Sequence, residues 1–243
     1  MKEQIAAMKE IIRNTDNIVA IIGIGVLIEC GAPNFLADDK VYEIEAKYHY
    51  SPEEILSTGF YYARKEKFFE FYKQEVLTTK IVPNESFEAL KELQRRGKLK
   101  TCITQNIYGA TRNYGLNHVI EMRGNINENW CTKCGKTFTE EYMRNAKDVP
   151  LCDECNNSIR PGVGLYGEMI RNDLLTEAVN AIQRADVLLV LGTNINESMI
   201  KNNVSNYPGD KLILITKNSH FTDSMADYHA NGYVKEILPM IVW

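Results

Sequence analysis

The sequence has no hydrophobic run long enough to cross a membrane. The longest run, Ile18 to Ile28, contains two glycines and falls well short of the ~20 apolar residues that a bilayer requires. No cleavable apolar region precedes it, since Ile5, Met8 and Ile12 fall on one face of an ordinary amphipathic helix. We therefore expect a cytoplasmic protein that does not use a membrane as a partner.

An excess of positive charge is also missing. The formal net charge is -4 at pH 7, so nothing favours nucleic acid or an anionic membrane surface as the main partner. Internal repeats and low-complexity segments are absent too. What the chain does have is 243 residues, of which 44% are hydrophobic. This fits one large α/β domain with a small insert.

Only six cysteines are present, and four of them form two close pairs, Cys131/Cys134 and Cys152/Cys155. Each two-residue gap lets both sulfurs of a pair point at one centre, and four thiolates suit a tetrahedral Zn²⁺ ion. Two disulfides or free thiols are the alternative, which the spacing disfavours. Four protein ligands leave no open position on the metal, so we expect a structural zinc ion and look for the chemistry elsewhere.

Short, β-branched apolar runs predict the buried strands of a parallel sheet. These runs are Ile18–Gly23, Lys100–Thr104, Val119–Met122, Val187–Gly192 and Lys211–Thr216. Helical patterns such as Ser86–Arg96 and Asp173–Arg184 alternate with them. The alternation predicts an α/β fold with a Rossmann-like, doubly wound sheet and helices on both faces.

Two segments interrupt this alternation. Residues 37–82 are rich in tyrosine and phenylalanine and contain helical stretches, and residues 126–160 contain the paired cysteines. We expect them to form one smaller lobe, with a cleft between it and the sheet. The predicted organisation is a Rossmann-like domain of residues 1–36, 83–125 and 161–243, a helical insert with a cofactor loop at 37–82, and a zinc-binding module at 126–160.

Gly23 and Gly25 follow the first predicted strand. Glycine permits a tight bend and lets backbone N–H groups approach a phosphate at the carboxyl end of a strand. The third glycine of the pattern G-x-G-x-x-G would fall at Ile28, so a purely structural turn is the alternative. Together with the expected topology, the turn favours a dinucleotide or a nucleotide diphosphate as ligand.

Five segments of the chain, in the right order, resemble motifs of the sirtuins, a family of NAD-dependent protein deacylases and ADP-ribosyltransferases. The segments are Gly23–Phe35, similar to G-A-G-I-S-x-x-S-G-I-P-D-F, Thr104–Ile107, similar to T-Q-N-I, Glu121–Gly124, similar to E-L-H-G, Arg160–Glu168, similar to R-P-x-V-x-x-F-G-E, and Gly192–Asn194, similar to G-T-S. The resemblance implies a Rossmann-like domain, a zinc ribbon, a helical insert and NAD in the cleft.

The resemblance also implies which residues contact NAD. They are Gly23, Gly25, Glu29, Asn34, Phe35, Gln105, Asn106, Gly192, Thr193 and Asn194. In the family the amides at Gln105 and Asn106 contact the nicotinamide ribose region, and an amide can do so without a particular protonation state. A turn that merely caps the strand is the alternative for this pair. The family's N-x-E after the last predicted strand is not reproduced, which leaves the adenine-ribose contacts open.

The departures from the family pattern fall on residues that do chemistry. The family's catalytic histidine, a general base on a ribose hydroxyl, aligns with Arg123. A guanidinium has a pKa above ~12 and cannot accept a proton at pH 7. The residues Leu27, Asn34, Leu36 and Tyr108 replace a serine, an aspartate, an arginine and an aspartate. We expect His118 to be structural. These changes argue against deacetylation by the family's route.

Asn106 and Arg123 are the candidate catalytic residues, although Arg123 would not act as a base. Its guanidinium would pair with a pyrophosphate or an acidic substrate group, or else form a strand-end salt bridge with Glu121 or Glu168.

Three functions are consistent with these residues. The first is NAD-dependent transfer of ADP-ribose to protein with impaired or absent deacetylation, partly like the class M sirtuins, which lack the usual histidine. The second is non-catalytic binding of NAD or ADP-ribose. The third is an atypical NAD-dependent protein deacylase. The partners implied are NAD or ADP-ribose and a protein substrate.

Overall fold

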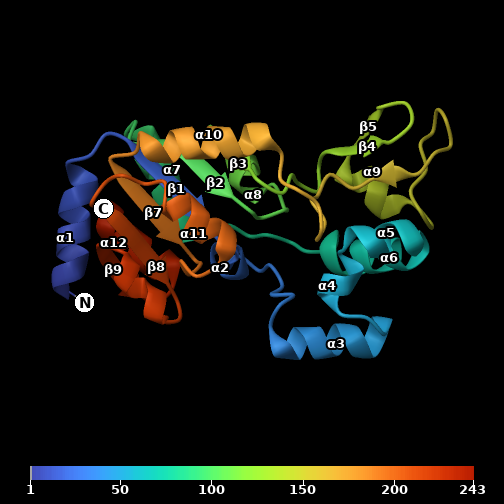
Figure 1. The fold of residues 1–243 in the computed structure, drawn as a ribbon, viewed down its shortest axis with the longest axis horizontal. Helices are drawn as coiled ribbons and strands as arrows, with labels where there is room; N and C mark the ends of the chain where they lie inside the picture. The colour runs from blue at the N-terminus through green and yellow to red at the C-terminus, as the bar shows by residue number, and fades with distance from the viewer. Residues whose placement is uncertain (1) are drawn as a thin grey trace.

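The main sheet contains six parallel strands in the order β3-β2-β1-β7-β8-β9. The computed structural model of the protein describes residues 2–243. The strands are β1 (Ile18–Ile22), β2 (Leu99–Thr104), β3 (Val119–Glu121), β7 (Val187–Leu191), β8 (Leu212–Thr216) and β9 (Tyr228–Asn231). Because the order reverses direction at β1, with β2 on one side and β7 on the other, the sheet is doubly wound. The predicted fold class is confirmed (Figure 1).

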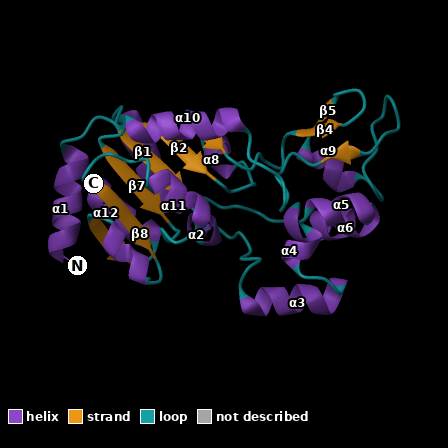
Figure 2. Cartoon of the chain, viewed as in Figure 1, coloured by secondary structure: helices purple, strands orange, loops and turns teal. Residues whose placement is uncertain are grey.

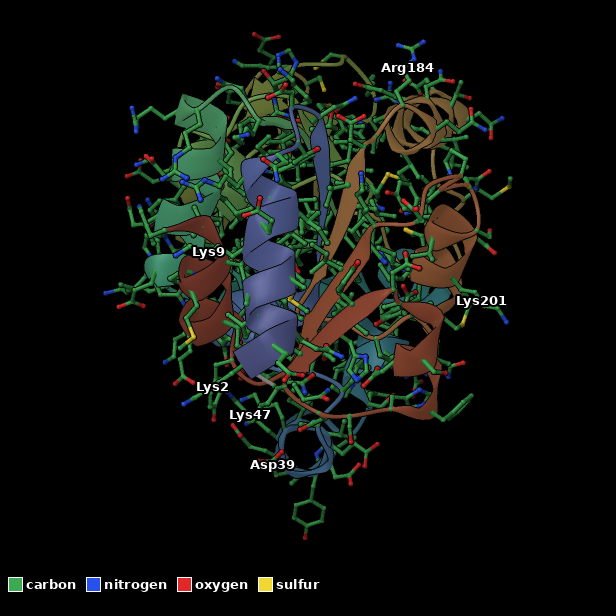
Figure 3. The ribbon with its side chains drawn as sticks, turned by 90° about the vertical axis from the view of Figure 1, so that its left-hand side faces the viewer. Lys2, Lys9, Asp39, Lys47, Arg184 and Lys201 are labelled. Atoms are coloured by element: carbon green, nitrogen blue, oxygen red, sulfur yellow. The ribbon has the colours of Figure 1, made fainter. Side chains whose placement is uncertain are left out.

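Helices cover both faces of this sheet (Figure 2). Those on one face are α1 (Lys2–Arg13), α7 (Glu85–Arg95) and α12 (Val234–Val242), and those on the other are α10 (Asn172–Gln183) and α11 (Ser198–Val204) (Figure 3). In β1, Ile18, Ala20 and Ile22 pack with the first group, while Val19 and Ile21 pack with the second. Both faces are buried, which explains why the strands appear in the sequence as continuous apolar runs.

Short helical elements connect the strands at the sheet's edges. They are α2 (Ile24–Ile28), α8 (Ala110–Asn113) and a 3₁₀ turn, η2 (Phe221–Met225). Among residues 2–243, no helix has both the length and the apolar character needed to cross a lipid bilayer.

A smaller lobe lies beside the sheet (Figure 1). Its helices are α3 (Asp38–Tyr48), α4 (Pro52–Ile55), α5 (Thr58–Ala63), α6 (Lys65–Phe71), the π-helical turn η1 (Tyr72–Val76) and α9 (Glu140–Asn145), and its antiparallel sheet contains β4 (Asn129–Cys131), β5 (Thr137–Phe138) and β6 (Ile159–Arg160). The expected lobe of a helical insert and a cysteine-bearing module is confirmed. The domain boundaries themselves stay a prediction.

Lys73 joins the two halves of this lobe. Its Nζ donates hydrogen bonds to the carbonyl oxygens of Ala146, Lys147 and Asp148 at 2.9, 3.0 and 2.9 Å. Nearby, the Arg160 guanidinium lies 4.9 Å from the centre of the Tyr61 ring. The helical insert thus holds the cysteine-bearing module through a few charged contacts in addition to its apolar core.

Lys73→Met should loosen residues 146–148 while leaving the main sheet folded. Methionine keeps much of the apolar stem but removes three charge-assisted hydrogen bonds, a local loss of about 2 kcal/mol because water replaces part of them. Backbone hydrogen exchange in this segment should therefore accelerate by roughly tenfold. Lys67→Met, which changes a neighbouring exposed lysine, is the control. Equal exchange rates in the two variants would show that Lys73 does not hold the module.

Candidate functional site

Gly23, Gly25 and Gly192 allow the end of β1 to pack closely against the end of β7. The N–H groups of Gly23 and Gly25 donate to the carbonyl oxygens of Leu191 and Gly192, each at 2.8 Å. A Cβ on Gly25 would lie 2.5 Å from the Gly192 carbonyl oxygen, so no larger residue fits. Gly192 has a φ of +66°, which glycine adopts without strain. The N–H groups of Gly23 and Gly25 are thus used to hold the ends of β1 and β7 close together. The contact of these glycines with a cofactor stays a prediction.

Asn106, in the loop that follows β2, holds the same turn through its side-chain amide. Its buried Nδ2 donates to the carbonyl oxygens of Ile22 and Gly23 at 3.3 and 3.2 Å. The neighbouring Gln105 donates from Nε2 to Glu197 Oε2 at 2.9 Å, and Glu197 in turn accepts hydrogen bonds from the first backbone N–H groups of α11. The carboxyl ends of β1, β2 and β7 therefore form one connected group.

The other predicted cofactor residues lie in loops. Thr193 contacts the Gly23 position directly. The side-chain oxygen of Asn194 accepts from Asn196 N at 3.0 Å, and that of Asn34 accepts from Leu36 N at 3.2 Å. The Phe35 ring lies 5.7 Å from the Phe71 ring of the small lobe. The structure thus brings together Gly23, Gly25, Asn106, Gly192 and Thr193, while Asn34 and Phe35 belong to the connection into the lobe.

Glu29 has a structural role at the start of α12, and its contact with a cofactor stays a prediction. Its two carboxylate oxygens accept hydrogen bonds from the backbone N–H groups of Val234 and Lys235, both at 2.9 Å. A carboxylate at this position complements the unsatisfied N–H groups and the positive end of α12. No local pattern could have revealed this role, because the partners are far apart in sequence.

Arg123 follows β3 at the carboxyl edge of the sheet, next to the end of β2, where Met122 N donates to Thr104 O. Its half-buried guanidinium lies 5.5 Å from the centre of the Tyr166 ring. Both expected salt-bridge partners are engaged elsewhere, because Glu121 lies 3.4 Å from Arg112 and Glu168 lies 2.5 Å from Arg160. The strand-end salt bridge is therefore wrong.

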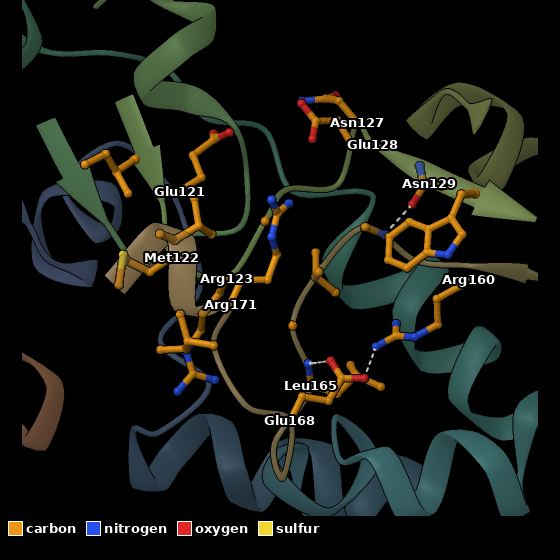
Figure 4. A pocket seen from close by; sticks show the side chains of 18 of the residues that line it. Glu121, Met122, Arg123, Asn127, Glu128, Asn129, Arg160, Leu165, Glu168 and Arg171 are labelled. Atoms are coloured by element: carbon orange, nitrogen blue, oxygen red, sulfur yellow. Dashed lines mark hydrogen bonds and ion pairs between the residues drawn. The ribbon is translucent and has the colours of Figure 1, made fainter. Parts of the chain in front are cut away.

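A cavity of about 1030 Å³ opens between the small lobe and the β3 edge of the sheet (Figure 4). Its walls come from β3, from β4 and β5, and from the segment that leads from β6 into α10. Arg123 projects into it. Trp130, which belongs to β4 of the lobe, also lines it. This confirms the expected cleft. Sequence reasoning did not identify Trp130 or Gly164 as lining residues, since neither belongs to a chemical pattern.

The four paired cysteines come together at one point. All four sulfurs lie within 4.8 Å of one another, with 3.4 Å between Cys131 and Cys155 and 3.6 Å between Cys134 and Cys152. A Zn–S distance of ~2.3 Å in a tetrahedron separates sulfurs by about 3.8 Å, so the cluster fits zinc. Hydrogen bonding from the Cys134 backbone N–H lowers the pKa of the Cys131 thiol to about 6, which favours the thiolate that a metal binds.

The family is decided by comparison with known proteins, in which residues 23–197 match the model described as the Sir2 family. The chain belongs to the Sir2 family. This sirtuin is 38% identical to the NAD-dependent protein deacetylase of Clostridium tetani (strain Massachusetts / E88), over 97% of this chain and 96% of the relative.

Solved structures agree with this assignment. A crystal structure of a Sir2 homologue in complex with NAD matches with a TM-score of 0.83 and 30% identity, over 98% of this chain and 92% of that chain. A second structure, from work on the mechanism and regulation of Sir2 enzymes, matches with a TM-score of 0.86 and 27% identity over 100% and 96%. The sirtuin resemblance drawn from the sequence is confirmed.

Cys131→Ser should destabilise this sirtuin, because the binding energy of a structural metal contributes to folding. We expect less than half an equivalent of zinc in the purified variant and a melting temperature lowered by about 5 °C or more. The control is Cys30→Ala, which removes a buried thiol outside the cluster and should leave the zinc content at one equivalent. Full zinc content and unchanged melting in Cys131→Ser would contradict the four-cysteine site.

Glu29→Ala should lower the free energy of unfolding by about 1–2 kcal/mol, since it removes both hydrogen bonds at the start of α12. Glu236→Ala is the matched control, because it changes an exposed carboxylate in the first turn of the same helix. Urea denaturation measures both variants. Equal stability of Glu29→Ala and the control would show that the capping contact contributes nothing.

Proposed function

We propose that this sirtuin consumes NAD and transfers ADP-ribose to a protein, with impaired or absent deacetylase activity. The observation that supports this most strongly is Arg123, an unpaired guanidinium at the position where the family resemblance places the histidine base. A permanently protonated side chain can stabilise negative charge but cannot remove a proton from a ribose hydroxyl.

The residues that still match the family's motifs suit the step that precedes deacylation. Cleavage of the bond between nicotinamide and ribose depends on positioning and on stabilisation of charge. NAD would supply the ADP-ribosyl group. The glycine turn follows β1 at the carboxyl edge of a doubly wound sheet, where nucleotides bind, and the amide of Asn106 is fixed beside this turn by its two hydrogen bonds.

Neither His118 nor Glu121 is placed to act as the missing base. His118 is exposed and precedes β3, whereas Arg123 follows that strand, so the two lie at opposite ends of it. The carboxylate of Glu121 accepts a hydrogen bond from Asn125 at 2.8 Å and pairs with Arg112. Its other oxygen is buried without a partner and is therefore shielded from a substrate hydroxyl.

Two other functions have specific support. Deacylation by an unusual route is favoured by the relatives, which are named as NAD-dependent protein deacetylases. Non-catalytic binding of NAD or ADP-ribose is favoured by the structural engagement of Glu29 and of the glycine N–H groups.

Arg123→His should add the base that the protein lacks. With NAD, an acetylated peptide and an acceptor protein, the unmodified protein should release nicotinamide and form ADP-ribosylated protein with little loss of acetyl groups. The variant should deacetylate at least ~10-fold faster, since a positioned general base contributes about 10²–10⁴-fold. Arg171→His, on the same cavity, is the control and should not gain this activity.

The unmodified protein distinguishes the three functions directly. Rapid deacetylation without ADP-ribosylated product would contradict the proposal in favour of the atypical deacylase. Binding of NAD by calorimetry without release of nicotinamide would support the non-catalytic function instead.

A further inference from the structure

Glu197 connects two strands of the main sheet across the end of the strand between them. It lies on the connection from β7 to α11, and its Oε2 accepts a hydrogen bond at 2.9 Å from Gln105 Nε2, on the connection that follows β2. Because β1 lies between β2 and β7, this hydrogen bond spans the point at which the strand order reverses. Ligands of doubly wound sheets bind in the crevice outside this point. Glu197 therefore borders the crevice in which we expect the dinucleotide.

The donors to the Glu197 carboxylate among residues 2–243 are all uncharged. Besides Gln105, they are the backbone N–H groups of Met199 and Ile200, at 3.3 and 3.0 Å. No lysine, arginine or histidine nitrogen of the described chain lies within 4.0 Å of this carboxylate. Its negative charge is thus held in place but not neutralised. Since a carboxylate can accept about four hydrogen bonds, it also keeps capacity for a further donor.

This anion is placed next to the candidate catalytic residue of the chain. Gln105 directly precedes Asn106, whose Nδ2 donates to the carbonyl oxygens of Ile22 and Gly23 at the glycine turn. The carboxylate of Glu29, by contrast, accepts from backbone N–H groups at the start of α12. Glu197 therefore brings a fixed negative charge to the part of the carboxyl edge where Asn106 lies.

The cleavage proposed above needs a negative charge at this place. When the bond between nicotinamide and ribose breaks, its electron pair leaves with the ring nitrogen of nicotinamide, which becomes neutral. The positive charge moves to C1′ and the ring oxygen of the ribose. An acceptor atom of the protein substrate then bonds to C1′ and releases its proton to water. A fixed anion beside the ribose stabilises the transition state more than the ground state, whereas the cation Arg123 does not.

We propose that Glu197 is a catalytic residue of this sirtuin. Its carboxylate accepts a hydrogen bond from a hydroxyl of the nicotinamide ribose and stabilises the positive charge that develops on that ribose. The inference rests on the NAD-consuming function proposed above, because that reaction is the one that places charge there. Glu197 acts through its charge and takes up no proton in this step.

The binding of two ligands tests this charge without any turnover. One ligand is ADP-ribose, and the other is an analogue in which a protonated pyrrolidine with the same hydroxyls replaces the terminal ribose. Both have the same phosphates, so the ratio of their Kd values reports on charge at the terminal ring. Isothermal titration calorimetry of the zinc-loaded protein at neutral pH measures this ratio.

Three variants separate charge from structure. Glu197→Gln removes the charge but keeps an oxygen that can accept from the first N–H groups of α11, and Glu197→Asp keeps the charge. Glu236→Gln, which changes an exposed carboxylate on α12, is the control. Near-ultraviolet circular dichroism confirms that each variant is folded.

We expect the unmodified protein and Glu236→Gln to bind the pyrrolidine analogue at least about tenfold more tightly than ADP-ribose, because a charge-assisted pair forms. In Glu197→Gln this preference should fall below about threefold, while Glu197→Asp should retain more of it. Glu197→Gln should also slow release of nicotinamide from NAD by about 10²-fold, a loss in kcat and not in KM.

No preference in the unmodified protein, or the same preference in Glu197→Gln, would overturn the inference. It would also be overturned if Glu197→Gln and Glu197→Asp weakened both ligands equally, since the residue would then only support the fold. A preference that depends on Glu197 supports the inference even where no ADP-ribosylated protein forms, and that second result would contradict the proposed function alone.

Discussion

The contact between Gly25 and Gly192 is the constraint on which the arrangement of the site depends. A side chain at Gly25 would meet the Gly192 carbonyl oxygen at 2.5 Å, so the ends of β1 and β7 can close only if both residues are glycine. Once they close, Asn106 reaches the carbonyl groups of Ile22 and Gly23 from the neighbouring strand. The carboxyl edge of the sheet is thus held together by contacts within the protein: backbone packing of the glycines and the side-chain amide of Asn106.

The ion pairs around this edge leave the guanidinium of Arg123 without a carboxylate partner among residues 2–243. The acidic neighbours that would have neutralised it, Glu121 and Glu168, are held by other arginines. Burial raises the pKa of Glu121, while the Asn125 hydrogen bond and Arg112 oppose the shift. The result is a cation at the carboxyl edge of the sheet whose two expected carboxylate partners are bound to other arginines.

Much of the sheet and the metal site could be predicted from the sequence because each has a local physical cause. In the main sheet, β1, β7 and β8 are buried along their whole length, and β2 and β3 over most of theirs, so they appear as apolar runs. The cysteine spacing reflects the geometry of a tetrahedral ion. β9, which is mostly half-buried, lacks such a run, and α12 contains Pro239, which normally disfavours a helix interior. The capping role of Glu29 and the wall that Trp130 forms in the cavity could not be predicted, since each depends on segments that only the tertiary fold brings together.

The central claim, that no titrating base serves this site near neutral pH, is tested most directly by the pH dependence of kcat/KM for deacetylation of an acetylated peptide at saturating NAD. If Arg123 occupies the position of the base, the rate should stay constant within about twofold between pH ~6 and ~8, because a guanidinium does not change its charge in this range. A rate that falls tenfold per pH unit below pH ~6.5 would reveal a catalytic imidazole that must be neutral and would contradict the claim.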